Sequence, residues 1–385
     1  MHPQMKEIRV SIYRGGTSKG IFIKENELPK KPQERKRVIQ AIFGSPDPRQ
    51  IDGLGGAEVL TSKLAIIGPP SREGADLDYT FAQVSFDSDL VDYGGNCGNI
   101  SSAVGAFAVN EGIVRAVEPI TQVRIHQVNT ACILLANVPV RDGKAQVNGN
   151  CRIDGVPGTG APILMDFFDS VGSTTGKVLP TGNPTDIISI PGYEDVEVTI
   201  VDAGNVVVFI EARSLGLKGT ELCREIEADR ELCARMEAIR AAATVKIGLA
   251  KTAEEATANP YAPFFAIVSP AQTYRSEIDN HTVHADDIDL TARLSFMLHM
   301  HKTYPGTGTV CTGAAARISG TLVYRQLSEE AKLRSKLRIG HPGGSICINA
   351  LRSEVGDFSQ LAYERTARKL LDGIAYVKDE VFDKE

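Results

Sequence analysis

The feature that most constrains the fold of this 385-residue chain is a weak internal repeat. The pattern IRVSIYRGGTSKGIFIK, which starts at residue 8, is echoed by VEVTIVDAGNVVVFIE, which starts at residue 196. Each consists of an alternating strand, a glycine-containing turn and a second apolar run. Two further echoes follow in the same order, which is hard to obtain by chance. The sequence therefore predicts two similar halves, residues 1–185 and 186–385, with a boundary near PTGNPTD (180–186).

The second and third echoes contain residues that can carry chemistry. LTSKLAIIG (60–68) is echoed by ATVKIGLA (243–250), so that Lys63 corresponds to Lys246. GGNCGNISSAVGAFAV (94–109) is echoed by GTGTVCTGAAARISGTLV (306–323), each with a glycine-rich turn, a cysteine and a small-residue helix. Ligand clefts commonly form where domains meet. We therefore expect the active site in the crevice between the halves.

The remaining pattern predicts an α+β protein that is rich in antiparallel sheet. Residues 8–13 and 21–23 are expected to form a hairpin around RGGTSKG. Alternating runs predict further strands over 80–86, 121–129, 131–140 and 144–149. Amphipathic patterns predict helices over 100–112, which ends at Gly112, and over 219–243 and 290–302.

Composition and charge limit the class of protein. The net charge of -6 argues against nucleic acid as the main partner, because phosphate binding needs basic patches. No segment approaches the run of about 18 apolar residues that a membrane span needs. The N-terminus, MHPQMKEIRV, lacks the apolar run of a signal peptide. We therefore expect a cytoplasmic protein that binds neither nucleic acid nor membrane.

Cysteines and histidines do not indicate a metal site or a disulfide framework. The seven cysteines are odd in number and scattered, and no C-x-x-C pair occurs, which favours reduced thiols. The histidine pairs lack carboxylate or cysteine partners at the spacing of a ligand set, so no metal is expected. These pairs are His281 with His284 and His299 with His301.

Cys97 in GGNCGN is the first candidate for catalysis. It precedes a predicted helix, and the free N–H groups and positive dipole end of a helix N-terminus favour an anion. That anion can be a cysteine thiolate or a substrate carboxylate. Such a cysteine can be an acid, a base or a nucleophile, or it can simply fill space. The matching cysteine loop in the other half favours a functional role.

Three other motifs offer binding or catalytic groups, each with a structural alternative. Thr17 and Ser18 in GGTSKG suit a carboxylate, or they belong to a tight hairpin with solvated polar residues. Lys63 lies in the apolar run SKLAII, where burial favours the neutral amine of a base; the alternative is a strand lysine that reaches solvent. Ser345 in GHPGGS presents turn donors to a ligand, or it belongs to an ordinary hairpin.

Taken together, RGGTSKG, GGNCGN, the Gly-Thr-Gly…Thr-Gly-Ala loop and GHPGG resemble the PrpF family, in order and over essentially the whole chain. The fold of that family is similar to diaminopimelate epimerase. The resemblance thus implies two pseudo-symmetric halves, each with a mixed, mostly antiparallel sheet wrapped around a central helix. It also implies an active site in the cleft between them.

The resemblance implies roles for individual residues. The segment Asn96-Cys97-Gly98-Asn99 resembles the first cysteine loop of the epimerase. In the second loop Val310 falls where the epimerase has its other cysteine, and Cys311 is displaced by one residue, which disfavours a two-thiol epimerase. Lys63 matches a lysine that acts beside the first cysteine in PrpF-like enzymes. Substrate carboxylates are expected at the following residues: Thr17, Ser18, Asn96, Gly98, Asn99, Thr312, Gly313 and Ser345.

We therefore expect a cofactor-independent isomerase that shifts a C=C bond by allylic proton transfer in a small unsaturated di- or tricarboxylate. Lys63 and Cys97 are expected to be acid and base, in either order. Overall resemblance favours conversion of 3-methylitaconate to 2,3-dimethylmaleate, with 2-methylaconitate cis-trans isomerisation and 4-oxalomesaconate tautomerisation as alternatives. An amino-acid epimerase or racemase and an inert carboxylate-binding protein are alternatives of another class. An exposed edge strand and long amphipathic helices would permit a homo-oligomer.

Overall fold

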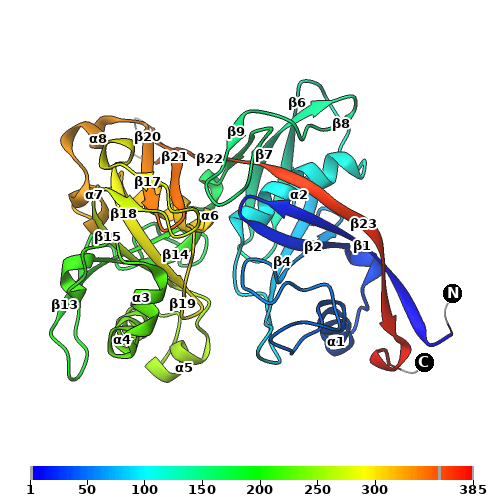
Figure 1. Cartoon of the computed structure of the whole chain (residues 1–385), viewed down its shortest axis with the longest axis horizontal. Helices are drawn as coiled ribbons and strands as arrows, with labels where there is room; N and C mark the ends of the chain where they lie inside the picture. Colours follow the sequence, from blue (N-terminus) through cyan, green and yellow to red (C-terminus); the bar gives the residue numbers. More distant parts are fainter. Residues whose placement is uncertain (1–2, 354–356, 384–385) are drawn as a thin grey trace. The chain divides into compact units, whose positions relative to one another are not determined.

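The computed structural model describes residues 3–353 and 357–383, which form two compact units (Figure 1). Unit 1 comprises Met1–Arg152, Gly158–Met165 and Arg365–Glu385, and unit 2 comprises Ile153–Pro157 and Asp166–Glu364. This division differs from the expected boundary near residue 185. The C-terminal residues belong to unit 1 because strand β23 (Ala367–Lys378) pairs with β1 (Met5–Gly15) from end to end.

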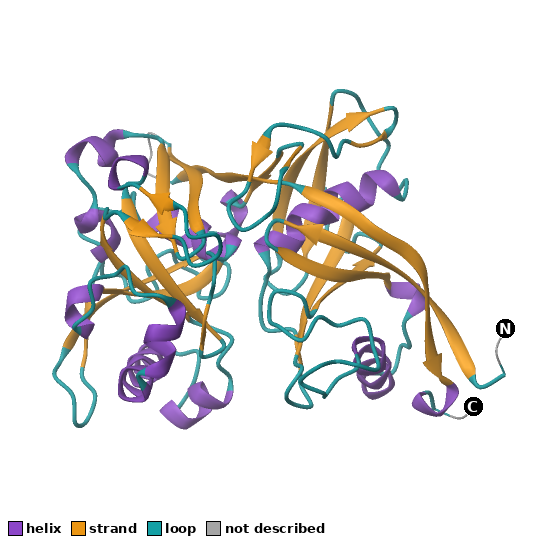
Figure 2. Cartoon of the chain, in the orientation of Figure 1, coloured by secondary structure: helices purple, strands orange, loops and turns teal. Residues whose placement is uncertain are grey.

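Strands dominate both units, as Figure 2 shows, and the expected α+β class is confirmed. Within the described residues, no helix is long and apolar enough to cross a membrane. The chain passes from one unit to the other within β11 (Ile163–Asp166) and β22 (Phe358–Arg365). The other elements of unit 1 are β2 (Ser18–Lys24), η1 (Glu25–Glu27), α1 (Pro32–Phe43), β3 (Lys63–Gly68), β4 (Leu77–Val84), β5 (Val91–Asp92), α2 (Gly98–Asn110), β6 (Ile120–Gln127), β7 (Cys132–Arg141), β8 (Lys144–Ala145), β9 (Cys151–Arg152), β10 (Thr159–Gly160) and η5 (Asp379–Val381).

The main strands of unit 1 form one mixed sheet. β1 pairs with β2, β3 with β4, and β6 with β7 in antiparallel fashion, whereas the β2–β3 and β4–β6 pairs are parallel. The hairpin predicted near the N-terminus is confirmed, with Gly15 opposite Ser18 across its turn. The helix predicted over 100–112 is observed as α2, and Gly112 follows it with a φ of 67°. The strand predicted over 144–149 is shorter and contains only Lys144–Ala145.

The alternation of side chains along each strand gives this sheet two apolar faces. Ile21 and Ile23 of β2 pack in one core with Leu64 and Ile66 of β3 and with the apolar side of α1. Phe22, which lies between the two isoleucines, points to the other face and packs against Tyr13 and Phe107 of α2. Every residue of α2 except the last is buried, so this helix is the central helix of unit 1.

Unit 2 repeats the same plan with different lengths. Its elements are η2 (Phe168–Ser170), β12 (Asp186–Ile188), β13 (Val196–Ala203), β14 (Asn205–Glu211), η3 (Ala212–Leu215), α3 (Cys223–Ala228), α4 (Arg230–Lys246), α5 (Ala253–Ala258), β15 (Phe264–Pro270), β16 (Tyr274–Arg275), β17 (Thr282–Val283), η4 (Ala285–Asp287), β18 (Leu290–Phe296), β19 (His299–Met300), α6 (Gly306–Ala315), α7 (Leu322–Gln326), α8 (Glu329–Leu333), β20 (Lys336–His341) and β21 (Gly344–Arg352).

The strand pairing of unit 2 follows that of unit 1 step by step. β13 and β14 form the hairpin, β14 pairs in parallel with β15, and β15 pairs in antiparallel fashion with β18. β18 then pairs in parallel with β20, and β20 in antiparallel fashion with β21. The wholly buried helix α6 corresponds to α2, since each precedes a strand that joins its sheet in parallel. The predicted pair of similar halves is therefore present in the topology.

Two helices predicted in the second half differ from the structure. The helix expected over 290–302 is wrong, because these residues form β18 and β19, joined by Met297 and Leu298 at positive φ. Within β18 apolar residues alternate with Thr291, Arg293 and Ser295, but Leu290 and Leu294 of the strand and Met297 and Leu298 of the turn together have helical spacing. The helix expected over 219–243 is divided into α3 and α4 at Asp229, whose side chain caps α4 by accepting a bond from Leu232 N.

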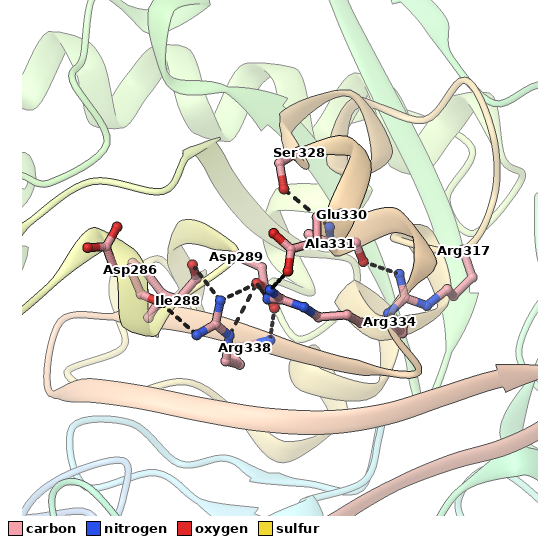
Figure 3. A network of polar contacts seen from close by, with 9 residues as sticks. All are labelled: Asp286, Ile288, Asp289, Arg317, Ser328, Glu330, Ala331, Arg334 and Arg338. Atoms are coloured by element: carbon pink, nitrogen blue, oxygen red, sulfur yellow. Dashed lines mark hydrogen bonds and ion pairs between the residues drawn. The ribbon is translucent and has the colours of Figure 1, made fainter.

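A buried carboxylate ties the start of β18 to the start of β20 in unit 2 (Figure 3). Asp289 accepts hydrogen bonds from Arg338 through the backbone N–H at 2.8 Å and the guanidinium at 2.7 Å. Arg334, which follows α8, binds the same carboxylate at 3.1 Å. Arg317 in turn donates to backbone carbonyls at the end of α8. This network fixes the segment that leads from α8 into β20.

Candidate functional site

The first part of the candidate site is the turn of the β1–β2 hairpin, which packs against the first turn of α2. A Cβ atom at Gly15 would lie 2.3 Å from the carbonyl oxygen of Asn99. At Gly16, where φ is 49°, a Cβ would lie 2.2 Å from Asn99 Oδ1. Only glycine allows this approach. It brings Thr17 Oγ1 within 3.0 Å and Ser18 Oγ within 3.5 Å of Asn99 Nδ2, which donates to both.

A buried arginine holds the other end of the Asn99 amide. Arg365 Nε donates to Asn99 Oδ1 at 3.0 Å, and the Arg365 side chain is nearly inaccessible to solvent. Because the amide oxygen accepts this bond, the amide nitrogen must face the hydroxyls of Thr17 and Ser18. Sequence reasoning missed Arg365, which is 266 positions from Asn99 and stands in no recognisable motif.

A second arginine adds positive charge to the same hairpin. Arg14 donates to the carbonyl oxygens of Thr366 at 2.7 Å and of Gly16 at 2.9 Å. Burial, together with the charge of Arg368, lowers the pKa of Arg14 from its ordinary value. The backbone around the turn is thus held by a cationic side chain, which suits a site for an anion.

The second part of the site is the loop that enters α2. Cys97 is the N-cap residue of α2, and its carbonyl oxygen accepts bonds from the backbone N–H of Ser101 at 2.8 Å and from its hydroxyl at 2.9 Å. The same hydroxyl donates to Asn96 Oδ1 at 2.9 Å. Gly98 and Asn99 follow as the first residues of the helix, where backbone N–H groups lack intrahelical acceptors. Cys97 itself is half-buried, so its thiol can meet a ligand.

The third part is a row of residues that lie directly opposite one another on neighbouring strands. Gly20 of β2 is paired with Lys63 of β3, Lys63 with Gln83 of β4, and Gln83 with Asp92 of β5. Opposed residues share one face of a sheet. Since Leu64, the neighbour of Lys63, belongs to the core with α1, the row lies on the face that carries α2.

This row ends beside the first turn of α2. A Cβ atom at Gly20 would lie 2.9 Å from the side chain of Ile100 and 3.1 Å from the carbonyl oxygen of Lys63. Ile100 is in the first turn of the helix that Cys97 caps. The structure therefore brings Lys63 and Cys97 to the same end of α2, together with the predicted residues Thr17, Ser18, Asn96, Gly98 and Asn99.

Lys63 is 4% exposed, and its surroundings are polar on one side. Lys63 Nζ donates to Gln83 Oε1 at 3.0 Å and lies 5.4 Å from the ring centroid of Phe81. Asp92 accepts a bond from Gly94 N at 2.6 Å, and burial raises the pKa of its carboxyl above the ordinary value. Sequence reasoning missed Gln83 and Asp92. The signal for Gln83 was a single amide in the otherwise apolar end of TFAQV.

The residues predicted in the second half lie differently from the expectation. Because α6 begins at Gly306, Thr312 and Gly313 are inside the helix and not on its N-terminal loop. Their backbone N–H groups lie beyond the first turn, where helical bonding uses them. The hydroxyl of Thr312 donates to Gly308 O at 2.8 Å, and a Cβ at Gly313 would meet Ile348 at 3.0 Å. Both residues pack the interior of unit 2.

The proposed counterparts of Lys63 and Cys97 also need correction. Val310 lies within α6 and is fully buried, and Pro305 is the N-cap residue that corresponds to Cys97. Cys311 donates to Val201 O at 3.2 Å, and burial raises the pKa of its thiol far above the ordinary value. Cys311 is therefore a packing residue. Lys246 is the last residue of helix α4, whereas Lys63 begins a strand, so their pairing is wrong.

Ser345 is in an ordinary hairpin, as its structural alternative predicted. β20 and β21 pair across Pro342 and Gly343, and Ser345 is the second residue of β21. Its backbone N–H donates to Asp154 Oδ2 at 2.7 Å. The donor that was expected to face a ligand thus binds a carboxylate of the same unit. Throughout residues 3–353 and 357–383, no group of three or more histidine, cysteine, aspartate or glutamate side chains is arranged to hold a metal ion.

Comparison with known proteins gives consistent results. A family model described as PrpF protein matches residues 5–378. A 3-methylitaconate isomerase of Eubacterium barkeri is 50% identical over 379 residues, which cover 98% of this chain and 99% of that protein. A 4-oxalomesaconate tautomerase of Pseudomonas putida is 39% identical over 367 residues, which cover 95% of each chain.

Solved structures agree with these matches. The crystal structure of a methylitaconate-delta-isomerase superimposes with a TM-score of 0.84 at 49% identity, and the match covers 99% of this chain and 98% of that one. A probable proline racemase from Agrobacterium radiobacter K84 superimposes with a TM-score of 0.55 at 12% identity, and covers 98% of this chain and 94% of its own. The second match shows the two-halved fold alone, because sequence identity is so low.

Proposed function

Because this chain belongs to the PrpF family, we propose that it is an isomerase that moves a C=C bond within a small unsaturated polycarboxylate by proton transfer. One observation supports the proposal above others. A buried lysine and a half-buried cysteine, two different proton carriers, lie at the same end of a central helix. Free backbone N–H groups and hydroxyls surround them, as an anionic substrate requires.

The preferred substrate is 3-methylitaconate, since a relative of that activity is 50% identical over almost the whole chain. The proton on its C3 is acidic because it is allylic and adjacent to a carboxylate. Lys63 or Cys97 removes this proton, which leaves a dienolate. The other residue donates a proton to the terminal methylene carbon, which becomes the methyl group of 2,3-dimethylmaleate. One proton leaves the substrate and one returns, so the chemistry calls for no cofactor.

Charge that develops on the dienolate is stabilised by fixed donors. The N–H groups of the first turn of α2 and the hydroxyls of Thr17 and Ser18 bind the carboxylates. Arg365 orients the Asn99 amide so that its nitrogen donates to those hydroxyls. Preorganised donors of this kind lower the barrier electrostatically. An acid–base pair contributes about 10²- to 10⁴-fold, so the donors supply much of the remaining acceleration.

Epimerisation of an amino acid by two thiols is disfavoured by the second unit. Such a mechanism needs a thiol at the start of both central helices, and the residue at the start of α6 is Pro305. The 2-methylaconitate and 4-oxalomesaconate reactions use the same proton chemistry and remain alternatives for the substrate.

The proposal is tested by proton NMR of the purified enzyme in D₂O. It is incubated in turn with 3-methylitaconate, 2-methylaconitate and 4-oxalomesaconate, and with proline and diaminopimelate as controls. A shifted alkene with deuterium at the new C–H bond supports allylic isomerisation, and the initial rates rank the substrates. Exchange only at the α-carbon of an amino acid would contradict the proposal.

A further inference from the structure

We propose that Gln83 is a positioning residue that holds the amine of Lys63 and sets the balance between its neutral and protonated forms. This inference rests on the proposed function of Lys63 as a proton carrier and goes beyond it, because Gln83 belongs to none of the sequence motifs. The starting observation is the bond of 3.0 Å from Lys63 Nζ to Gln83 Oε1, made between two buried side chains.

The orientation of the Gln83 amide is determined by its other contacts. Gln83 Nε2 donates to the carbonyl oxygen of Ser62 at 2.9 Å and to that of Val59 at 3.3 Å. Carbonyl oxygens only accept, so the amide nitrogen must face them and the amide oxygen must face Lys63. The loop that precedes β3 therefore aims an acceptor at the amine. The loop itself is braced by Ser62 Oγ, which donates to Gln50 Oε1 at 2.7 Å.

Unit 2 has neither a lysine nor a glutamine at the positions that correspond to Lys63 and Gln83. By strand register Phe264 corresponds to Lys63, because each is the first residue of the strand that pairs in parallel with the hairpin. Phe296 corresponds to Gln83, and the rings of Phe264 and Phe296 are packed with their centroids 5.1 Å apart. Where the amine is replaced by an apolar ring, the amide is replaced as well. The fold itself thus does not require a glutamine at this position.

The contact predicts the direction in which a substitution of Gln83 changes the protonation of Lys63. The neutral amide oxygen accepts a bond from the ammonium and stabilises it. Gln83→Met, which is similar in length but offers no oxygen, therefore favours the free amine. Further titratable groups on this face include Tyr13 of β1 opposite Gly20, Tyr79 of β4, Asp92 of β5 and Cys97 at the start of α2, and the substitution leaves them unchanged.

The test measures protonation of Lys63 without any substrate. Full-length protein is labelled with trace acetic anhydride across a pH series, since only the free amine reacts, and acetylation of Lys63 is read by peptide mass spectrometry. In Gln83→Met the midpoint should move downward by about one pH unit. The pH profile of kcat/KM for 3-methylitaconate should shift in the same direction.

A matched control separates this effect from general disturbance. Gln127 is also fully buried in unit 1 and bound through its amide, with Oε1 accepting from Thr130 N at 2.8 Å. Gln127→Met removes an amide of the same kind opposite Tyr79, four residues along β4 from Gln83, and should leave the Lys63 midpoint unmoved. Midpoints that coincide in wild type and Gln83→Met would overturn the inference. Labelling needs no turnover, so the result stands even where the isomerase activity itself fails to appear.

Discussion

Lys63 and Phe264 occupy the same position in the two units: each opens the strand that pairs in parallel with the hairpin, opposite Gly20 and Val207 respectively. A similar relation links Cys97 with Pro305, the N-cap residues of the two central helices. Both proposed proton carriers therefore belong to unit 1, and unit 2 has an apolar ring and a proline in their places. The repeat is preserved as architecture, and the proposed chemistry is confined to one copy.

Removal of Lys63 or Cys97, the proposed proton carriers, should abolish most of the turnover. Lys63→Ala and Cys97→Ser are expected to lower kcat for 3-methylitaconate by about 10²- to 10⁴-fold, because each removes one member of the acid–base pair. Lys246→Ala is the matched control. Lys246 is the last residue of helix α4 in unit 2, and its Nζ lies 3.5 Å from the carboxylate of Asp186. Near wild-type rates in both site variants, measured by NMR, would exclude the assignment.

Alkylation should distinguish Cys97 from the other thiols. Burial raises the pKa of the thiols of Cys233 and Cys347 above the ordinary value, which lowers the fraction of reactive thiolate at these two positions. Iodoacetamide is thus expected to modify Cys97 before Cys233 and Cys347, with loss of activity in parallel, and 2,3-dimethylmaleate should protect it. Peptide mass spectrometry over a time course measures the rates. Equal rates at the three cysteines would contradict the expectation.

The close approach of the hairpin to α2 predicts a large stability difference between two glycine substitutions. Gly15→Ala places a Cβ 2.3 Å from the Asn99 carbonyl oxygen, so backbone must move, at a cost of about 3 kcal/mol. Gly112→Ala meets no atom within 4 Å and costs only the strain of its positive φ, about 1–2 kcal/mol. Urea unfolding followed by circular dichroism compares the two free energies. A smaller loss for Gly15→Ala would refute the packing argument.

The stability of unit 2 should depend on the ionisation of Asp202. Burial raises the pKa of this carboxyl, and hydrogen bonds from the backbone N–H groups of Thr174 and Thr175 offset only part of the effect. Because the folded-state pKa exceeds the unfolded value, the contribution to stability is complete below the unfolded pKa and is lost as pH rises through the folded pKa.

Asp202→Asn removes this titration while it keeps an oxygen that accepts from the same N–H groups. Relative to wild type, the variant should therefore be more stable to unfolding at about pH 7 than at about pH 4. Urea titrations at the two pH values measure this difference. A difference independent of pH would show that Asp202 does not titrate in this range.

The local elements of the site could be predicted from sequence because nearby residues determine them. RGGTSKG specified the hairpin that contains Thr17 and Ser18, and GGNCGN followed by small residues specified the start of a buried helix at Cys97 and Asn99. The helix predicted over 290–302 failed because the turn residues Met297 and Leu298 continue the apolar pattern of β18 with helical spacing, which masked the alternation of the strand.

The correspondence between the halves was decided only by the tertiary structure. Two glycine-containing segments, at 306–308 and 312–314, resemble the cysteine loop of the first half, and only the observed start of α6 at Gly306 shows which one is equivalent. In the same way, strand register and not residue type relates Lys63 to Phe264.

The sequence by itself therefore determined the paired architecture, the hairpin and the central helix, and it predicted Lys63 and Cys97 as the two proton carriers. The tertiary structure decided which groups act upon them. Gln83 meets Lys63 through the pairing of β3 with β4, and Arg365 reaches Asn99 from the far end of the chain. Hydrogen bonds between residues distant in sequence depend on register and packing, which no local pattern encodes.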